Sequence, residues 1–154
     1  MNEKYITKAL TKVLTMPVLP NGKPYAYAKS ENLTAYCDNY CAWCVPANGN
    51  NVTNPQAYEM PSLMQRFRID DVFMKEVKDT GIRKVVSGKT KSEIAVFQCD
   101  EFEIHVNVRM LKLFTSLNCR FWAKSYDTPL LIEDLDRIPD GMAIGIIMPV
   151  KPVK

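Results

Sequence analysis

The chain has 154 residues, of which 47% are hydrophobic and 24% charged, and its formal net charge is +3. This composition is typical of a globular protein with a hydrophobic core, and so small a net charge does not by itself indicate a nucleic-acid-binding protein. No apolar run approaches the length of a transmembrane helix, and the charged, amphipathic N-terminus is unlike a secretory signal. We therefore expect no membrane association and a cytoplasmic protein whose five cysteines are reduced.

The first predicted element is an amphipathic helix over residues 5–15, because apolar residues recur there at helical spacing. Pro17 ends this helix, since proline lacks the backbone N–H that helix continuation requires. Residues 24–29 and 31–46 are predicted strands. The polar segment 47–61, rich in Gly, Asn and Pro, is a predicted loop or linker.

A second helix is predicted to follow a short strand at 67–69. Asp70 and Asp71 are suitable capping residues, and Gly81 is a suitable C-terminal stop. The residues on its buried side are Val72, Phe73 and Val77.

Strands predicted at 82–86, 93–98 and 102–106 lead into a third helix that Asn107 caps. The expected buried residues of that helix are Val108, Leu111, Phe114 and Leu117, and the last expected strands are 120–124, 130–133 and 143–150. One helix followed by several antiparallel strands thus recurs about three times. We expect an α+β fold with antiparallel sheets and about three amphipathic helices, forming one domain over 1–154 or two parts at 1–46 and 66–154.

Three cysteines raise the question of a metal site, because Cys37, Cys41 and Cys44 have the C-x3-C-x2-C spacing of radical enzymes that hold an iron–sulfur cluster. If 33–45 is one strand, Cys37 and Cys41 share a face and lie roughly 13 Å apart, while Cys44 points the other way. Structural cysteines are therefore favoured over an iron–sulfur or zinc site. A zinc site would also need a fourth ligand, such as Cys99, Cys119 or His105.

Other motifs in the sequence do not assemble into a catalytic site. The C-x-x-C of Cys41 and Cys44 lacks the following helix that would activate a thiol. Gly88-Lys89-Thr90 resembles the end of a phosphate-binding loop, but Arg83 stands where that pattern needs glycine. His105, the single histidine, lies among apolar residues. We therefore expect no enzymatic activity, no cofactor and no metal.

Basic residues accompany the apolar face of each predicted helix. If the three helices pack side by side, these residues form one basic surface that contacts phosphates without reading bases. The alternative is that each basic stripe only solvates a helix surface. The predicted DNA-binding residues are Lys4, Lys8 and Lys12 on the first helix, Lys75 and Lys78 on the second, and Arg109 and Lys112 on the third.

Several segments together resemble the bacterial DNA polymerase III β sliding clamp. Residues 102–117 resemble the strand and helix that open the last domain of that family, and 125–133 resemble its S...P-x-x-I-E strand. Residues 143–150 are similar to its closing strand with a V-M-P ending. Upstream, 10–19 and 33–38 resemble its first helix with the L-P segment and an adjacent strand.

This resemblance implies a DNA-clamp-like domain with sheets outside and helices inside, forming part of a ring around duplex DNA. The closing strand of the family lines a pocket that receives short hydrophobic motifs from polymerases and other clients. A closed ring takes six such domains, so a chain of this length implies a homo-oligomer, a borrowed partner or no ring. The residues that match the pocket strand are Ile146, Met148, Pro149 and Val150.

The sequence therefore predicts a non-catalytic sliding-clamp-like protein, that is, a processivity factor for DNA replication. It would associate with duplex DNA irrespective of sequence and recruit a polymerase or repair partner. The alternative is a small α+β protein-interaction or inhibitor protein without DNA binding, for example a virus-encoded one. A third class, an enzyme or metalloprotein, is less favoured.

Overall fold

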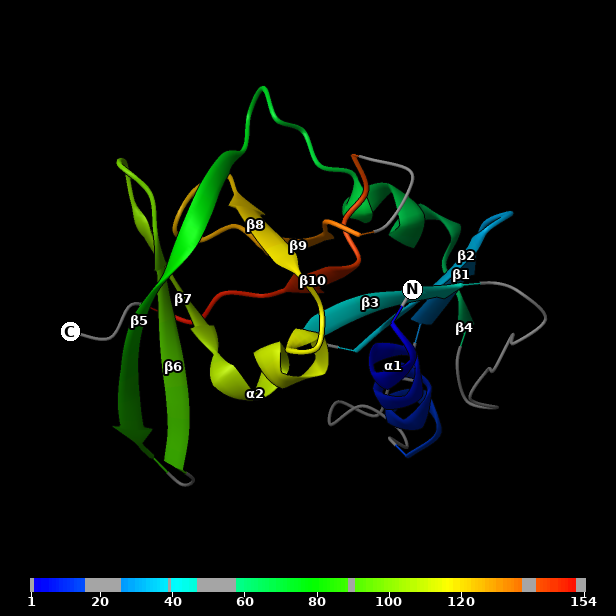
Figure 1. Ribbon diagram of the computed structural model, residues 1–154, viewed down its shortest axis with the longest axis horizontal. Helices are drawn as coiled ribbons and strands as arrows, with labels where there is room; N and C mark the ends of the chain where they lie inside the picture. The colour runs from blue at the N-terminus through cyan, green and yellow to red at the C-terminus, as the bar shows by residue number, and fades with distance from the viewer. Residues whose placement is uncertain are drawn as a thin grey trace.

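The computed structural model describes residues 2–15, 26–38, 40–46, 58–88, 91–136 and 141–151 (Figure 1). The helical segments are α1 (Glu3–Thr15), the 3-10 segment η1 (Pro61–Phe67), α2 (Val108–Leu111) and the 3-10 segment η2 (Lys112–Phe114). The strands are β1 (Ala26–Lys29), β2 (Leu33–Cys37), β3 (Cys41–Pro46), β4 (Tyr58–Glu59), β5 (Lys75–Ser87), β6 (Lys91–Gln98), β7 (Glu103–Asn107), β8 (Cys119–Ala123), β9 (Leu130–Asp134) and β10 (Gly145–Ile147). Their order in the sheet is β4-β1-β2-β3-β10-β9-β8-β5-β6-β7.

The described strands pair antiparallel, with the exception of β1 and β4, which run parallel. An antiparallel sheet accompanied by separate helical segments is the α+β arrangement that the sequence predicts.

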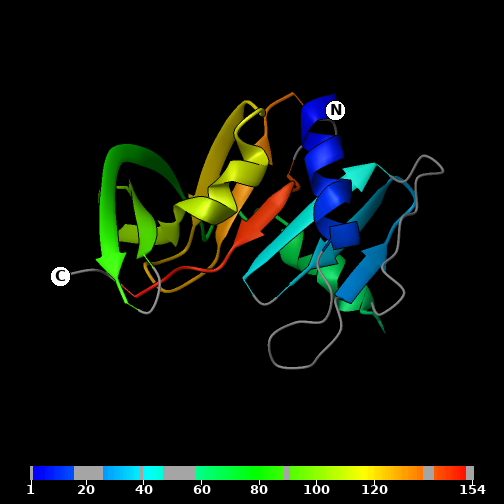
Figure 2. The same ribbon diagram turned by 90° about the horizontal axis from the view of Figure 1, so that it is seen from below.

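Two α-β-β-β units form the centre of the sheet. The first consists of α1, β1, β2 and β3, and the second of α2 with η2, β8, β9 and β10. Because β3 and β10 pair antiparallel in the middle, the order β1-β2-β3-β10-β9-β8 lists the strands of the two units symmetrically. Figures 1 and 2 show α1 and α2 on one face of this sheet and η1 on the opposite face. The predicted recurrence is therefore present twice, not three times.

The first predicted helix is confirmed as α1. The side-chain Oδ1 of Asn2 accepts hydrogen bonds from the backbone N–H groups of Lys4 (2.9 Å) and Tyr5 (3.3 Å), which caps the helix. Tyr5, Ala9 and Val13, spaced four residues apart, are buried against the sheet. Of the apolar residues whose spacing predicts the helix, Ala9 and Val13 are buried, Ile6 and Leu10 are partly buried, and Leu14 is 64% exposed. Tyr5 was not expected on the packed face, although it is fully buried there.

The core under the helices centres on the register pair of Trp43 in β3 and Gly145 in β10. The Trp43 indole N–H donates to the carbonyl of Ala9 in α1 at 3.2 Å. A Cβ atom at Gly145 would lie 2.3 Å from Cζ of Phe114, so the glycine provides the space for that ring. Phe114 in turn stacks on Tyr5 of α1 with 5.9 Å between ring centroids. Both helical elements are held on the sheet at this point.

The predicted helix beginning at Asp70 is wrong. Residues 71–73 form a turn, and strand β5 follows. Val72 and Phe73 are 79% and 71% exposed, and only Val77 of the three expected core residues is buried. The Asp70 carboxylate accepts a hydrogen bond from Val72 N–H, but the chain then enters a run rich in Val, Thr and Ile, which favour strands.

The predicted strand 31–46 is a hairpin of β2 and β3. Oδ1 of Asp38 accepts the backbone N–H groups of Tyr40 and Cys41, both at 2.7 Å, which fixes a tight turn. The turn changes the expected placement of the thiols. By the register of β2 and β3, Cys37 and Cys44 share a face, while Cys41 lies on the opposite one.

The third predicted helix begins where expected, because Oδ1 of Asn107 accepts the N–H of Arg109 at 2.9 Å. It is shorter than predicted, since it changes to a 3-10 turn and ends at Phe114. The closing strand is also shorter, Gly145–Ile147 within the predicted 143–150. Most of the predicted loop 47–61 lies outside the described residues, and its end contains β4 and the start of η1.

The predicted short strand at 67–69 is reduced to one isolated bridge between Arg68 and Met142. Phe67 belongs to η1, where it is buried. The preceding proline, Pro61, occupies the first position of this 3-10 segment, where its missing N–H costs nothing.

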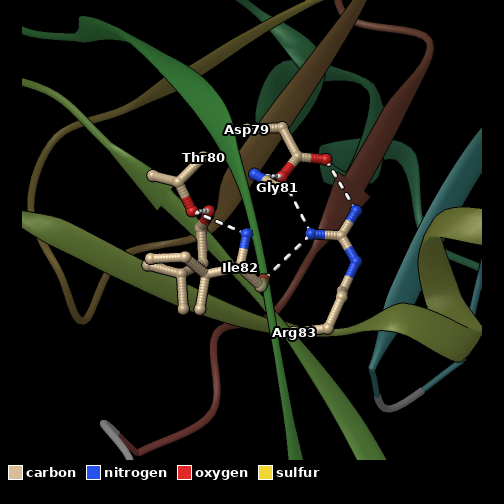
Figure 3. Close-up of polar contacts among 6 residues, drawn as sticks. Asp79, Thr80, Gly81, Ile82 and Arg83 are labelled. Carbon is tan, nitrogen blue, oxygen red and sulfur yellow. Dashed lines mark hydrogen bonds and ion pairs between the residues drawn. The ribbon is translucent and has the colours of Figure 1, made fainter.

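Strand β5 pairs with two strands and contains a bulge. Residues 75–77 pair with β8, whereas 78–79 and 83–87 pair with β6, and the register shifts between Asp79 and Arg83. Gly81 occupies the left-handed region at φ 80°. The Arg83 guanidinium donates to both carboxylate oxygens of Asp79, at 2.9 and 2.8 Å, and Thr80 Oγ1 donates to Val96 O at 2.8 Å (Figure 3). These bonds fix the bend by which the β5–β6–β7 hairpins leave the central sheet.

Gly145→Ala should destabilise the protein by about 1–3 kcal/mol, because the new methyl group overlaps the Phe114 ring. Urea unfolding measures this as a lower midpoint at unchanged m value. Phe114→Leu, alone and combined with Gly145→Ala, completes a double-mutant cycle. The double variant should lose less stability than the sum of the single variants. Strict additivity would contradict the packing described here.

The Arg83 guanidinium, through its hydrogen bonds, holds the pKa of Asp79 below its ordinary value of 3.8. The stabilisation is therefore present above that ordinary pKa and is lost as the pH falls through the lowered value. Both side chains are 35% exposed, so the contribution to stability is below about 1 kcal/mol. In Arg83→Gln, carboxyl titration by NMR should show a higher Asp79 pKa, whereas Lys75→Gln should leave it unchanged.

Candidate functional site

The first candidate site is the exposed side of α1, α2 and η2, which we call the helix surface. Hydrogen bonds join its two parts. Asn2 Nδ2 donates to Ser116 O at 3.0 Å, and Lys8 Nζ donates to Lys112 O at 3.3 Å. Lys4, Lys8, Arg109 and Lys112, four of the predicted DNA-binding residues, are all exposed on these adjacent elements.

Lys12, also predicted to bind DNA, is engaged elsewhere. Its ammonium lies 3.6 Å from the Asp38 carboxylate and 5.1 Å from the centroid of the Trp43 ring. The Asp38 side chain is only 3% exposed, so Lys12 compensates a nearly buried charge beside the β2–β3 turn. This contact assigns Lys12 a structural role at the edge of the helix surface.

Lys75 and Lys78 do not lie on a helix, because the predicted second helix is strand β5. The Lys75 ammonium is 3.0 Å from a Glu101 carboxylate oxygen, and this hydrogen bond raises the pKa of Lys75. Lys78 is exposed on the same strand. The structure therefore does not place these two lysines on the helix surface, and a continuous surface of three helices is not formed.

Arg83 is a further cation near the helix surface. It was not among the predicted DNA-binding residues, which were chosen by their positions on the predicted helices. A hollow of about 310 Å³ between the β5 bulge and η2 is lined by Arg83 and Lys112, with Phe97 and Phe121 inside. Arg83 therefore adds a guanidinium beside the helix surface, although Asp79 balances its charge. The sequence signal for it is the acid-base pair at positions 79 and 83 around Gly81.

The second candidate site is a groove of about 490 Å³ on the opposite face, which we call the outer groove. Its floor is a row of cross-strand neighbours, because Cys37 pairs with Ala42, Ala42 with Ile146 and Ile146 with Leu131. The size lies within the range of ligand pockets. The groove is lined by Cys37, Asp38, Tyr40, Cys41, Ala42, Leu63, Arg66, Met74, Lys124, Thr128, Pro129, Leu131, Ile146 and Met148.

Two of the four predicted partner-binding residues belong to this groove. Ile146 forms part of its floor, and Met148, 46% exposed, lies at its edge. Pro149 and Val150 do not line it. The Val150 N–H donates to His105 O at 2.8 Å, which attaches the end of the chain to β7.

Two of the three thiols of the candidate metal motif, those of Cys37 and Cys41, are poor nucleophiles. Burial raises the pKa of Cys37 and raises that of Cys41 to about 12. Among the described residues, no group of three or more His, Cys, Asp or Glu could hold a metal ion. The five cysteines are not in disulfides, and His105 is buried with Nε2 3.4 Å from Glu103.

In comparisons with protein-family models, curated proteins and solved structures, nothing matches the chain. The sliding-clamp resemblance therefore stays a prediction. Within the part of the chain that the structure describes, no helix has the length and hydropathy needed to cross a membrane.

Cys41 should resist alkylation by iodoacetamide in the native protein. It is 4% exposed, and with a pKa of about 12 roughly one thiol in ten thousand is ionised at about pH 8. Mass spectrometry of the digested protein measures labelling at each cysteine, and the same reaction in urea should label Cys41 readily. Rapid labelling of Cys41 in the native protein would contradict the burial described here.

Proposed function

We propose that this protein is a non-catalytic, clamp-like protein that associates with duplex DNA through the helix surface. The observation that carries the proposal is the pair of α-β-β-β units, which brings both helices side by side on one face of one sheet. Their exposed charged residues are four cations and one acid, namely Lys4, Lys8, Arg109, Lys112 and Glu3.

The chemistry of this surface suits phosphates better than bases. Lysine ammonium groups on flexible stems contact phosphate oxygens as point charges, and such contacts carry no sequence information. Neither helix presents a run of Asn, Gln or Arg of the kind that reads base edges in the major groove. We expect binding that is independent of sequence and loose enough for the protein to slide.

The outer groove supplies the second half of the proposal. Its apolar floor suits a short hydrophobic segment from a polymerase or repair protein, and its lining includes Ile146 and Met148, two of the residues that match the pocket strand in the clamp resemblance. The floor residues Ala42 and Ile146 alternate along their strands with Trp43 and Gly145, which face the helices, so the groove and the helix surface lie on opposite faces of the sheet. Both can therefore be occupied at the same time. A single copy does not encircle a duplex, so a ring would require further copies.

The runner-up function is a protein-interaction or inhibitor protein without DNA binding. The outer groove favours it, because an apolar groove recruits a protein segment whether or not the opposite face contacts DNA. DNA retention therefore separates the two functions.

The affinity for plain duplex DNA should fall steeply with salt. Four phosphate contacts predict a slope of log K against log salt of about −3.6. In the double variant Lys4→Glu with Arg109→Glu, at most two contacts remain, so the slope should be no steeper than about −1.8. Fluorescence anisotropy with two duplexes of unrelated sequence, between about 50 and 200 mM salt, measures both slopes. Lys29→Glu with Lys151→Glu, an equal change of net charge outside the helix surface, should keep the wild-type slope.

Equal binding of the two duplexes supports the DNA association, and a wild-type protein that ignores DNA at low salt rejects it in favour of the interaction function. Thermal unfolding of each variant checks that it is folded, so that a shallower salt dependence of DNA binding cannot be attributed to unfolding.

A further inference from the structure

The 71–73 turn presents the two most exposed large hydrophobic side chains among the described residues. Val72 is 79% exposed and Phe73 71% exposed. Asp71 on the same turn is exposed as well. Figure 1 shows this turn projecting from the molecule ahead of β5, so a partner can reach it. An exposed valine and phenylalanine next to each other are typical of an interaction site.

The turn is rigidly supported, which lowers the entropic cost of binding. The Asp70 carboxylate accepts the Val72 N–H at 3.2 Å, and the Asp70 carbonyl accepts the N–H groups of Phe73 at 3.2 Å and Met74 at 2.8 Å. Strand β5 then anchors the chain through buried Val77. These hydrogen bonds order the backbone that carries the apolar pair before a partner arrives, which reduces the entropy lost on binding.

The outer groove has the complementary chemistry. Its floor is apolar, and Arg66 and Lys124 add positive charge. Among the described residues, no ion pair involves Arg66, Lys124 or Asp71. Asp38, the acid in the groove, is already engaged with Lys12 and two backbone N–H groups. The groove thus suits an apolar segment that carries a carboxylate.

The turn and the groove are neighbours on one face, because Met74 directly after the turn lines the groove, while Val72 and Phe73 do not. Two adjacent, complementary patches on one face satisfy the requirement of a two-fold dimer, in which each patch contacts the other patch of the second copy.

We propose that two copies of this chain associate through these faces, with Val72 and Phe73 of each copy in the outer groove of the other. Asp71 then lies beside Arg66 and Lys124 of the second copy. The inference rests on the proposed role of the groove as a docking site, but it does not rest on DNA association. It leaves both helix surfaces exposed on the far sides of the dimer, and a client segment would have to compete with the second copy for the groove.

Sedimentation equilibrium of the full chain over a concentration series tests the dimer. Wild-type protein should show a monomer–dimer equilibrium, and Val72→Ser with Phe73→Ser should weaken it at least tenfold. The matched control is Ile82→Ser with Val85→Ser, which changes two other exposed hydrophobic side chains, on β5. This control should keep the wild-type equilibrium.

A charge exchange tests the reciprocal contact. Asp71→Lys alone and Arg66→Glu with Lys124→Glu alone should each lose the dimer, because both homodimers then oppose like charges. An equimolar mixture of the two variants should recover a heterodimer, since each turn again meets a groove of opposite charge. A structural defect in either variant would not be repaired by mixing, and circular dichroism checks that both are folded.

A wild-type chain that stays monomeric over the series, a dimer that survives the turn substitutions, or a mixture of folded variants without heterodimer overturns the proposal. The DNA affinity of the variant with both Val72→Ser and Phe73→Ser is measured separately. This measurement distinguishes failure of the dimer proposal from failure of the proposed DNA association. A monomer that still binds DNA supports the helix surface whatever happens at the groove.

Discussion

The packing of Phe114 over Gly145, beside Trp43, is the interaction on which the arrangement of the two units depends. Trp43 and Gly145 face each other across the central strand pair, one with the largest side chain and the other with none. The space above the glycine holds the Phe114 ring, and the same ring stacks on Tyr5. The sheet, α1 and η2 therefore meet at one point. The close approach of the two helical elements, and with it the grouping of their cations, follows from this contact.

The two faces of the sheet have different chemistry because side chains alternate across each strand. Trp43 and Gly145 point to the helices, whereas their neighbours Ala42 and Ile146 point to the other face and form the floor of the groove. A strand pair in the centre of the sheet thus serves both sites. Each residue of β10 is buried against one of the two faces. A substitution in β10 therefore alters the packing under the helices or the floor of the groove.

The sequence was informative where short-range chemistry decides the structure. Asn107 followed by apolar residues at helical spacing correctly locates the start of α2, and the helical spacing of apolar residues such as Ala9 and Val13 locates α1. The same reasoning failed at Asp70, because a capping acid before Val72 and Phe73 looks identical whether a helix or a turn follows. It also failed at Asp38. Its carboxylate accepts the N–H groups of Tyr40 and Cys41 and so stabilises a tight turn within the segment 31–46, which the sequence predicts to be one strand.

The candidate sites were predictable only in part. Lys8 and Lys112 come together because β3 pairs antiparallel with β10, a long-range contact that helical periodicity does not contain. Lys12 has the same spacing as Lys4 and Lys8, but only the fold shows that Asp38 lies beside it. The outer groove depends equally on register, since Ile146 meets Ala42 and Leu131 from two other strands.

The position of β10 between β3 and β9 has a consequence for how the chain reaches its native state. β10 belongs to the last part of the chain, yet its partner Cys41–Trp43 belongs to the first third. Pairing at such sequence separation requires closure of a long loop. The chain loses this conformational entropy before the stabilising contacts form, which is characteristic of slow folding. During synthesis, the edge of β3 stays unpaired until the final strand has emerged. The two units thus become one sheet only as a late event.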